Sequence, residues 1–431
     1  MGSYRTGRPI YITDGCRTPF LKSQGKPGPF RPSDLAVGAG RAMLLRQPFG
    51  ADELDEVILG CVNPGPDEAN IARVVSLRLG CGNRVPAWTL QRNCGSGMQA
   101  IDSAAASISD GRSDLVLAGG TEAMSHAPLL LNTAMVQFLA DWNRSRTFWE
   151  KTALLGRLRP AHLRPVIGLL HGLTDPGTGL SMGQTAENLA YLFGISRERM
   201  DAYALESHRR LARAQDERRL TEIVPLYTKD GAYFDRDEGL RRDADLSVLA
   251  RLKPVFDRPF GRVTAGNSAQ ITDGAAWMIL ASEEAVRKYQ LQIAGRILAC
   301  SWEGLAPEKM GLGPVHAMTR VLQQQGLRAE DIDCWEINEA FAAQVLACLD
   351  AWTSPEYCRN ELGLDHPWTA LDTDRLNVDG GALAIGHPVG SSGVRIVFHL
   401  VEVMRRNRLR RGMAALCIGG GQGGAMLIER D

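Results

Sequence analysis

The feature of this 431-residue sequence that most constrains its fold is an internal repeat, because the last third follows the plan of the first. The strand pattern at 331–337 answers the one at 53–59, and the pattern at 414–420 answers the one at 114–120. Helical patterns separate these short apolar runs in both parts, which predicts a layered α/β architecture. Two copies of one plan would place the ends of equivalent strands face to face. We therefore expect one active site between two related halves.

Two turns at matching positions of this repeat carry reactive side chains. Cys94 stands in the motif Asn-Cys-Gly-Ser-Gly-Met, between the apolar run 85–90 and an alanine-rich helical pattern. His387 stands in the motif His-Pro-Val-Gly-Ser-Ser-Gly, which leads into the helical pattern 394–404. The glycines allow the backbone to turn sharply, so each motif predicts a tight turn at the start of a helix.

A cysteine at a helix N-terminus receives only part of the stabilisation that a thiolate needs. With a reference pKa of about 8.5 the thiol is about 3% ionised at pH 7, and lowering that pKa by two units takes about 2.7 kcal/mol. A helix terminus supplies about 0.3–1 kcal/mol. Taken alone, Cys94 could equally be a buried, inert residue. His387 is the predicted partner, either as the base for the thiol or as an imidazolium that lowers its pKa.

Two further polar side chains stand at predicted strand ends of the second half, where α/β proteins place their sites. Asn338 lies in Asn-Glu-Ala-Phe and could hold a water that donates to an oxyanion, although a turn residue is the alternative. Cys417 could shuttle a proton at a carbon centre, although it could also only fill a strand. No helix follows the glycine run after Cys417, which argues against a dinucleotide site there.

Together, these motifs closely resemble those of the thiolase family, in the same order and over nearly the whole chain. The resemblance implies the α/β thiolase fold, with two similar βαβαβαββ-type halves in a five-layer αβαβα sandwich and an inserted loop domain. In this sequence the N-terminal half would comprise 1–121 and 254–284, the inserted loop domain 122–253, and the C-terminal half 285–431.

The resemblance also implies acyl transfer between coenzyme A thioesters, with coenzyme A as a co-substrate and no permanently bound cofactor or metal. Carried over by motif, Cys94 is the acylated nucleophile, His387 is its activator and Cys417 is the acid/base. Asn338, acting through a water, and His387 would form one oxyanion hole. The backbone amides of Cys94 and Gly419 would form the other.

From these roles we predict a 3-ketoacyl-CoA thiolase (acetyl-CoA C-acyltransferase) of fatty-acid β-oxidation. A biosynthetic acetoacetyl-CoA thiolase is the alternative within the family. A decarboxylating ketosynthase-like enzyme would pair its cysteine with two histidines, or with a histidine and an asparagine, and would lack the Cys417 motif. A non-enzymatic lipid- or CoA-binding relative should have lost one of the four polar groups, and none is lost here.

Four residues are candidates for substrate binding: Met182, Ser268, Ala269 and Phe341. Two positions depart from the family pattern. Ala269 stands where many thiolases carry a serine near the pantetheine. Ser181 stands where acetoacetyl-specific members have histidine, which favours a longer acyl chain.

The segment 129–178 resembles the insertion of thiolase subunits in trifunctional fatty-acid oxidation complexes, although those usually have histidine where Asn338 stands. It contains six basic residues and one acidic residue between Arg144 and Arg164. Such a segment could dock on a β-oxidation partner subunit or on a membrane surface, and the alternative is that it covers the acyl tunnel or packs between subunits. Four apolar residues form one predicted helical stripe in it: Met135, Phe138, Leu139 and Trp142. We expect the charged helical pattern 197–219 to face solvent.

Composition limits the partners and the location. Lys plus Arg and Asp plus Glu both number 49, so no overall field recruits nucleic acid. The nine cysteines are scattered without a CxxC pair, which argues against a disulfide framework and a zinc site. The first seven residues are polar and no apolar run approaches the length of a membrane span. We expect a cytoplasmic homodimer or homotetramer that binds acyl-CoA substrates.

Overall fold

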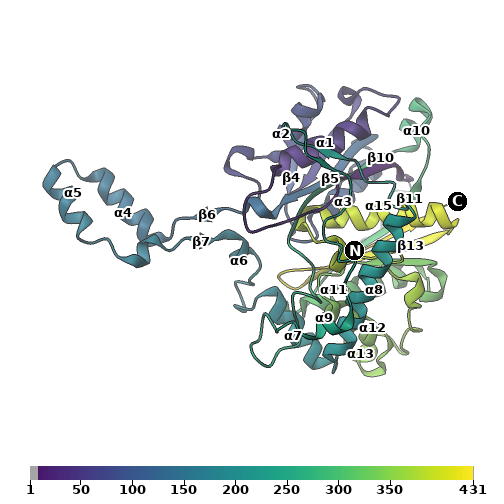
Figure 1. The fold of residues 1–431 in the computed structure, drawn as a ribbon. Coiled ribbons are helices and arrows are strands. Elements are labelled where there is room, and N and C mark those ends of the chain that lie inside the picture. Colours follow the sequence, from purple (N-terminus) through teal and green to yellow (C-terminus); the bar gives the residue numbers. More distant parts are fainter. Residues whose placement is uncertain (1–7, 431) are drawn as a thin grey trace.

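A computed structural model describes residues 8–430 and shows a mixed α/β fold (Figure 1). Residues 1–7, where we expect no targeting sequence, and residue 431 lie outside the described residues. Within the described chain, ten strands form one sheet in the order β12-β13-β14-β11-β1-β10-β5-β3-β4, and the short β2 pairs with β10. No helix between residues 8 and 430 is long and apolar enough to cross a membrane.

The sheet consists of two groups of strands that repeat one pattern. In the first group β3, β4 and β5 are parallel and β10 is antiparallel to β5 and β1. In the second group β12 and β13 are parallel, and β14 is antiparallel to β13 and β11. A two-residue pairing of β1 with β11 joins the groups. The strands are β1 (Tyr11–Arg17), β2 (Leu21–Lys22), β3 (Glu56–Gly60), β4 (Ala87–Leu90), β5 (Leu115–Ala123), β10 (Thr272–Ala281), β11 (Gly295–Gly304), β12 (Cys334–Ile337), β13 (Arg411–Ile418) and β14 (Gln422–Glu429).

Helices cover the outer faces of both groups and also fill the space between them. On the outer face of the first group lie α1 (Pro32–Leu44) and α2 (Ile71–Leu79), and α10 (Glu283–Tyr289) follows β10. On the outer face of the second group lies α11 (Gly313–Gln325), with α12 (Ala342–Thr353) and α13 (Pro355–Asn360) beyond it.

The central layer consists of α3 (Ser96–Ser109) and α15 (Val389–Asn407), which lie against each other between the two groups of strands (Figure 1). Side chains from both halves form one central core around them, and each outer helix layer has a core of its own. Every residue of α15 from Val389 to Met404 is buried. The predicted five-layer thiolase fold is thus confirmed.

Glycines let the first turns of α3 and α15 approach to backbone contact. A Cβ added at Gly393 would lie 2.3 Å from the backbone nitrogen of Met98, and one at Gly97 would lie 2.9 Å from the carbonyl oxygen of Gly390. A Cβ at Gly120 in β5 would lie 2.1 Å from the same carbonyl. The turns that precede α3 and α15, which contain Cys94 and His387, are brought together by this contact.

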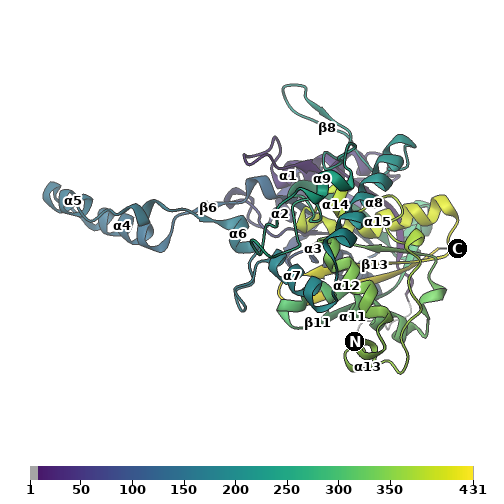
Figure 2. The same ribbon diagram turned by 60° about the horizontal axis from the view of Figure 1, so that its bottom comes forward.

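The segment after β5 leaves the body of the molecule as a long helical hairpin (Figures 1 and 2). The two-stranded ladder of β6 (Leu129–Leu130) and β7 (Val166–Ile167) connects it to the body and leads into α6 (Gly168–Gly172). The hairpin itself is formed by α4 (Thr133–Arg144) and α5 (Phe148–Leu155), and neither helix contains a buried residue. We call residues 129–167 the projecting hairpin.

The rest of the inserted region packs on the body and includes α7 (Met182–Leu192), α8 (Arg197–Asp216), α9 (Leu246–Ala250) and the small ladder of β8 (Leu226–Tyr227) with β9 (Tyr233–Phe234). The expectation that the charged helix faces solvent is wrong for one side of α8. Met200, Ala204 and Leu211 recur at helical spacing and are buried against α12 and α14 (Ala382–Ile385). The division of the chain at 121, 253 and 284 stays a prediction, although β5 continues in the sheet to Ala123.

We predict that Gly393→Ala destabilises the protein by at least about 1–3 kcal/mol, because the new methyl group meets backbone that cannot move away as a flexible side chain would. Urea denaturation of the purified variant measures the change. Gly304→Ala is the matched control, since a Cβ at Gly304 meets nothing within 4 Å. Equal stability of the two variants would contradict the close contact of α3 with α15.

Candidate active site

Cys94 lies in the turn between β4 and α3, which is held from both sides. Asn93 has a left-handed conformation (φ 44°), which asparagine tolerates better than most residues. Its side-chain amide donates to the carbonyl oxygen of Gly419 at 2.8 Å. Ser96 accepts a hydrogen bond from the backbone N–H of Arg92 and donates to the carbonyl of Asn93. The turn is therefore fixed against the loop that follows β13.

The sulfur of Cys94 faces two backbone donors. Burial raises the pKa of the Cys94 thiol to about 11, and hydrogen bonds from the backbone amides of Gly419 and Cys94 offset only part of that effect. The helix end alone therefore does not produce a resting thiolate, because loss of hydration costs more than the donors return. The same two amides lie where they could stabilise an oxygen on a carbon bonded to this sulfur.

His387 occupies the matching turn before α15. Gly386 has a φ of 111°, and a Cβ there would lie 2.3 Å from Thr272. The backbone N–H of His387 donates to the carbonyl of Gln270 at 3.1 Å. On the imidazole, Nδ1 lies 2.7 Å from the Ser392 hydroxyl, which orients the ring and leaves Nε2 available to a reacting group. The histidine is therefore held through both its backbone and its ring.

His387 and Cys94 are each uncharged at rest. Burial, together with the positive charge of Arg395, lowers the pKa of His387 to about 4. Our expectation that an imidazolium lowers the pKa of Cys94 is therefore wrong, because the dry site disfavours both charged forms. The remaining possibility from the sequence is a neutral imidazole that accepts the thiol proton as the sulfur attacks.

Asn338 lies directly after β12 and is fully buried. Its backbone N–H donates to the carbonyl of Ala415 in β13 at 2.9 Å. Its side-chain nitrogen lies 3.4 Å and 3.5 Å from the two ring nitrogens of His387, and its side-chain oxygen accepts from Arg395 at 3.4 Å. The structure thus brings together Asn338 and His387, which stand 49 residues apart.

Cys417 lies near the end of β13 and is buried. Burial raises the pKa of its thiol well above the usual value, and the Cys94 and Cys348 thiols add to this. The influence of Cys94 places the two predicted catalytic sulfurs within electrostatic range of each other. Cys348, on α12, was not predicted near the site, and its thiol donates to the carbonyl of Gly311.

The four substrate-binding candidates lie in two groups around these residues. Ser268 pairs with Phe341 as an isolated β-bridge, and the backbone N–H of Ala269 donates to Ala340. The Ser268 hydroxyl donates to the carbonyl of Thr264. Met182 lies next to Gly419, where a Cβ would come within 3.0 Å of its sulfur.

Sequence reasoning missed three polar residues that position this site: Asn93, Gln270 and Ser392. Each lies in or next to a motif that the sequence showed, and an asparagine in a glycine-rich turn is itself a signal for left-handed backbone. The partner of Asn93 is 326 residues away and that of Gln270 lies in another part of the chain, whereas Ser392 contacts a residue only five positions earlier. Only the fold shows which polar group each one contacts.

A cysteine that faces two backbone donors, with a second thiol and a histidine–asparagine pair nearby, defines a site for covalent acyl transfer. Family models agree: the thiolase N-terminal domain matches residues 10–284 and the thiolase C-terminal domain matches residues 291–430. The chain therefore belongs to the thiolase family of acyltransferases, for which coenzyme A is a co-substrate.

Individual relatives differ in their substrates. The chain is 40% identical to the beta-ketoadipyl-CoA thiolase of Pseudomonas aeruginosa, over 98% of this chain and 99% of that protein. It is 34% identical to the mitochondrial trifunctional enzyme subunit beta of Bos taurus, over 98% of this chain and 88% of that protein. The human mitochondrial 3-ketoacyl-CoA thiolase in complex with CoA is similar in structure, with a TM-score of 0.84, 36% identity and coverage of 100% and 99% of the two chains.

We predict that the rate of alkylation of Cys94 by iodoacetamide rises about tenfold per unit between about pH 6 and 9, because the fraction of thiolate grows below a pKa of about 11. Mass spectrometry of the Cys94 peptide measures the rate. Labelling should be selective, since the other eight cysteines are buried. A rate that is already constant above about pH 6 would reveal a resting ion pair and contradict the neutral pair.

Proposed function

We propose that this protein is a cytoplasmic 3-ketoacyl-CoA thiolase of fatty-acid β-oxidation, which transfers its acyl group through Cys94 in a ping-pong reaction. One observation carries the proposal: Asn93 holds the Gly419 loop against the Cys94 turn at 2.8 Å, and the backbone amides of Cys94 and Gly419 both lower the pKa of the Cys94 thiol against the effect of burial. In this proposal Cys417, whose thiol is influenced by Cys94, and the contacting residues His387 and Asn338 act at the same point from the other half of the molecule.

In the first half-reaction Cys94 attacks the 3-keto carbon of the substrate and gives its proton to His387. The resulting oxyanion lies next to the amides of Cys94 and Gly419. The bond between C2 and C3 then breaks, and its electrons form the enolate of acetyl-CoA. His387, now protonated, and a water held by Asn338 donate to the enolate oxygen, and the Cys417 thiol protonates C2. Acetyl-CoA leaves and the shortened acyl group stays on Cys94.

In the second half-reaction the thiol of coenzyme A gives its proton to the Cys417 thiolate and attacks the acyl carbon. The same two backbone amides stabilise the oxyanion of this step. The bond to Cys94 breaks, its sulfur regains a proton from His387, and acyl-CoA leaves. Each group thus returns to its starting protonation state. Synthesis from two acyl-CoA molecules is the reverse sequence.

The residues beside the Gly419 loop favour an uncharged acyl chain. Met182 contacts this loop, and Phe256 packs edge-to-face on Phe341 at 6.0 Å. Ser181 begins α7, where its hydroxyl accepts from the backbone N–H of Gln184. The beta-ketoadipyl-CoA thiolase relatives favour a second candidate, a 3-ketoacyl chain that ends in a carboxylate. Such a chain would need a cationic or hydrogen-bonding group at its far end.

We predict thiolysis of straight-chain 3-ketoacyl-CoA substrates, with kcat/KM rising from acetoacetyl-CoA to longer chains as more apolar surface is buried. Absorbance of the 3-ketoacyl-CoA with coenzyme A present measures the rate. Cys94→Ala should lose about 10³-fold or more in kcat, while Cys81→Ala, in the outer N-terminal core, should keep the parental rate.

Four other outcomes would contradict this proposal in different ways. Preference for 3-oxoadipyl-CoA over an uncharged chain of equal length would assign the second candidate. A rate highest with acetoacetyl-CoA would favour the biosynthetic alternative. If Cys94→Ala cleaved the substrates as fast as the parent, or if the parent bound acyl-CoA without turnover, the thiolase mechanism would be wrong.

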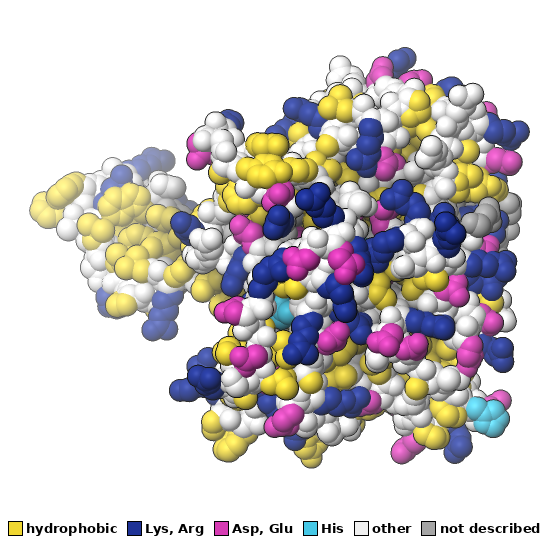
Figure 3. Space-filling model, turned by 45° about the vertical axis from the view of Figure 1, so that its right-hand side comes forward, with side chains coloured by type: hydrophobic (Ala, Val, Ile, Leu, Met, Phe, Trp, Pro, Cys, Tyr) yellow, Lys and Arg dark blue, Asp and Glu magenta, His cyan; other side chains and the backbone are white. Residues whose placement is uncertain are grey.

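We also propose that the projecting hairpin docks on an anionic lipid surface. Phe148 and Trp149, at the start of α5, expose 75% and 78% of their surface. Within the hairpin Phe138 stacks on Trp142, and Lys151 of α5 lies over the Trp142 ring at 5.4 Å. Part of the apolar stripe predicted for α4 therefore holds the two helices together. Figure 3 shows hydrophobic side chains gathered on the hairpin with Lys and Arg at its edges. Basic residues around exposed aromatic ones fit a negatively charged interface.

We expect the protein to sediment at low salt with phosphatidylcholine vesicles that contain phosphatidylglycerol, and to stay in solution with phosphatidylcholine alone or at high salt. The variant Phe148→Ser/Trp149→Ser should lose this binding. A matched control replaces equally exposed aromatics on the body, as Tyr191→Ser/Phe260→Ser.

No sedimentation at low salt would contradict membrane docking. Size-exclusion chromatography of the same variants tests whether the hairpin joins subunits of the proposed homodimer or homotetramer. A change in oligomeric state without lipid binding would assign the hairpin to a protein partner instead.

A further inference from the structure

Arg395 is a buried cation that contacts the site without facing Cys94. It lies in α15 and its side chain is 1% exposed. Its guanidinium contacts two polar side chains at the end of β12. One nitrogen lies 3.2 Å from the carboxylate of Glu336 in β12, and another donates to the side-chain oxygen of Asn338 at 3.4 Å. Glu336 and Asn338 are two residues apart, so one guanidinium spans the end of β12.

This contact decides which way the Asn338 amide points. A guanidinium has only donors, so it can accept nothing from the amide nitrogen. The oxygen of Asn338 must therefore face Arg395, and the nitrogen must face His387, from whose ring nitrogens it lies 3.4 Å and 3.5 Å away. With the amide reversed, two donors would meet at Arg395 and His387 would face an acceptor. An oxyanion hole needs the donor orientation before the substrate arrives.

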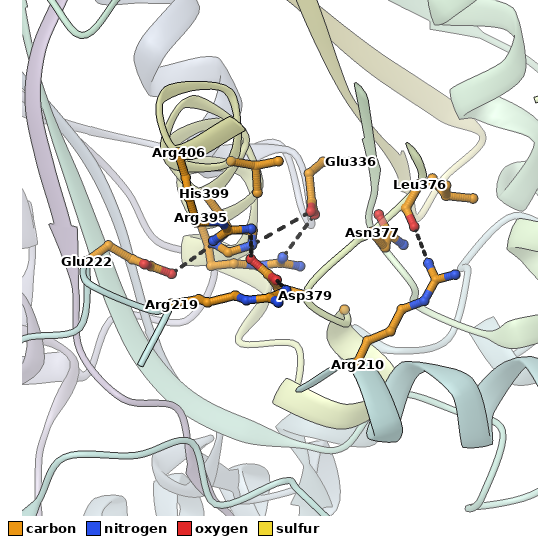
Figure 4. A network of polar contacts seen from close by, with 12 residues as sticks. Arg210, Arg219, Glu222, Glu336, Leu376, Asn377, Asp379, Arg395, His399 and Arg406 are labelled. Carbon is orange, nitrogen blue, oxygen red and sulfur yellow. Dashed lines mark hydrogen bonds and ion pairs between the residues drawn. The ribbon is translucent and has the colours of Figure 1, made fainter. Parts of the chain in front are cut away.

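The cation is itself held by a buried network of charges (Figure 4). His399, one turn further along α15, lies 4.0 Å from Glu336, 3.4 Å from Asp379 and 3.0 Å from Glu222. Burial lowers the pKa of His399, but Glu222 and Asp379 outweigh this and raise it to about 10, so the imidazole is charged. Two buried cations therefore flank the Glu336 carboxyl group; burial raises its pKa to about 7 and outweighs the two cations, which lower it.

The network continues to the surface through residues that do not touch the site. Arg406 and Arg219 bind Asp379 at 2.7 Å and 3.2 Å and are more than a quarter exposed. They belong to the same charge cluster as Arg395, yet neither contacts Asn338 or His387 among the described residues. Replacing one of these arginines therefore tests how the network affects stability without removing the contact between Arg395 and Asn338.

We propose that Arg395 is a positioning residue for acyl transfer: it holds the oxygen of Asn338 so that the amide nitrogen faces His387 and the substrate. The inference rests on the proposed thiolase function and adds a residue to its machinery. Arg395 also brings a positive charge close to the neutral His387. Glu122 from β5 accepts from the backbone N–H of Gly390 in this turn, and the charged groups that act on Arg395 besides Glu336 include Arg17, Glu339 and Asp237.

The test uses the full chain and two variants of this position. Arg395→Lys keeps a buried charge for Glu336, but a single ammonium cannot bridge Glu336 and Asn338 as the planar guanidinium does. Arg395→Gln/Glu336→Gln removes both charges together, so no unpaired ion stays buried. Arg406→Gln is the matched control within the same network.

We expect both Arg395 variants to lose about 10–10²-fold in kcat for thiolysis, with KM nearly unchanged, because the lost orientation acts on the transition state. The acid limb is the part of the pH profile in which kcat/KM falls as the pH is lowered. In the double variant this limb should shift from about pH 4 to a higher pH, because the pKa of His387 rises when a neighbouring cation is removed. Arg395→Lys should keep that limb near the parental position. Arg406→Gln should change neither kcat nor the limb.

Parental kcat in both folded Arg395 variants would overturn the inference, while an inactive parent would instead overturn the thiolase function. An equal loss in Arg406→Gln would show that the network acts only on stability. Thermal melting of each variant completes the comparison. If both Arg395 variants failed to fold while Arg406→Gln folded, Arg395 would be a structural residue, which also contradicts the proposal.

Discussion

The backbone contact between the first turns of α3 and α15 is the constraint on which the rest of this structure depends. It requires small residues on both sides, and Gly97, Gly393 and Gly390 provide them. The contact places the Cys94 turn and the His387 turn at one point, although they belong to different halves. A methyl group in this contact would separate the two turns, so packing and chemistry depend on the same glycines.

Burial then determines the electrostatics of the site. The dry interior keeps Cys94 as a thiol and His387 as a neutral base, and it strengthens every donor that is already in place. In the proposed reaction, negative charge therefore develops only on the oxyanion, next to the backbone amides of Cys94 and Gly419. The permanent positive charge that acts on His387 is that of Arg395, which is held by Glu336. The residues proposed to react are thus uncharged, whereas the residues that hold them in place include a charged pair.

The inserted region serves two different parts of the molecule. Its packed portion supplies Glu222 to the buried charge network, Met182 to the Gly419 loop and α8 to the outer surface of α12. Its projecting hairpin has no buried residue in either helix and presents exposed aromatic and basic side chains instead. We therefore propose that this segment acts through a contact outside the subunit.

The sequence by itself determined the architecture and predicted the reactive groups, because repeated hydrophobic periodicity and glycine-bounded motifs are local signals. It thereby indicated Cys94, His387, Asn338 and Cys417. It could not decide their protonation, because the pKa values of Cys94 and His387 follow from desolvation by residues distant in the chain. Nor could it show that Arg395 orients Asn338, since a guanidinium 57 residues away acts only when α15 and β12 pack together. Only tertiary structure fixes distances and hydration, and these set the chemistry of the site.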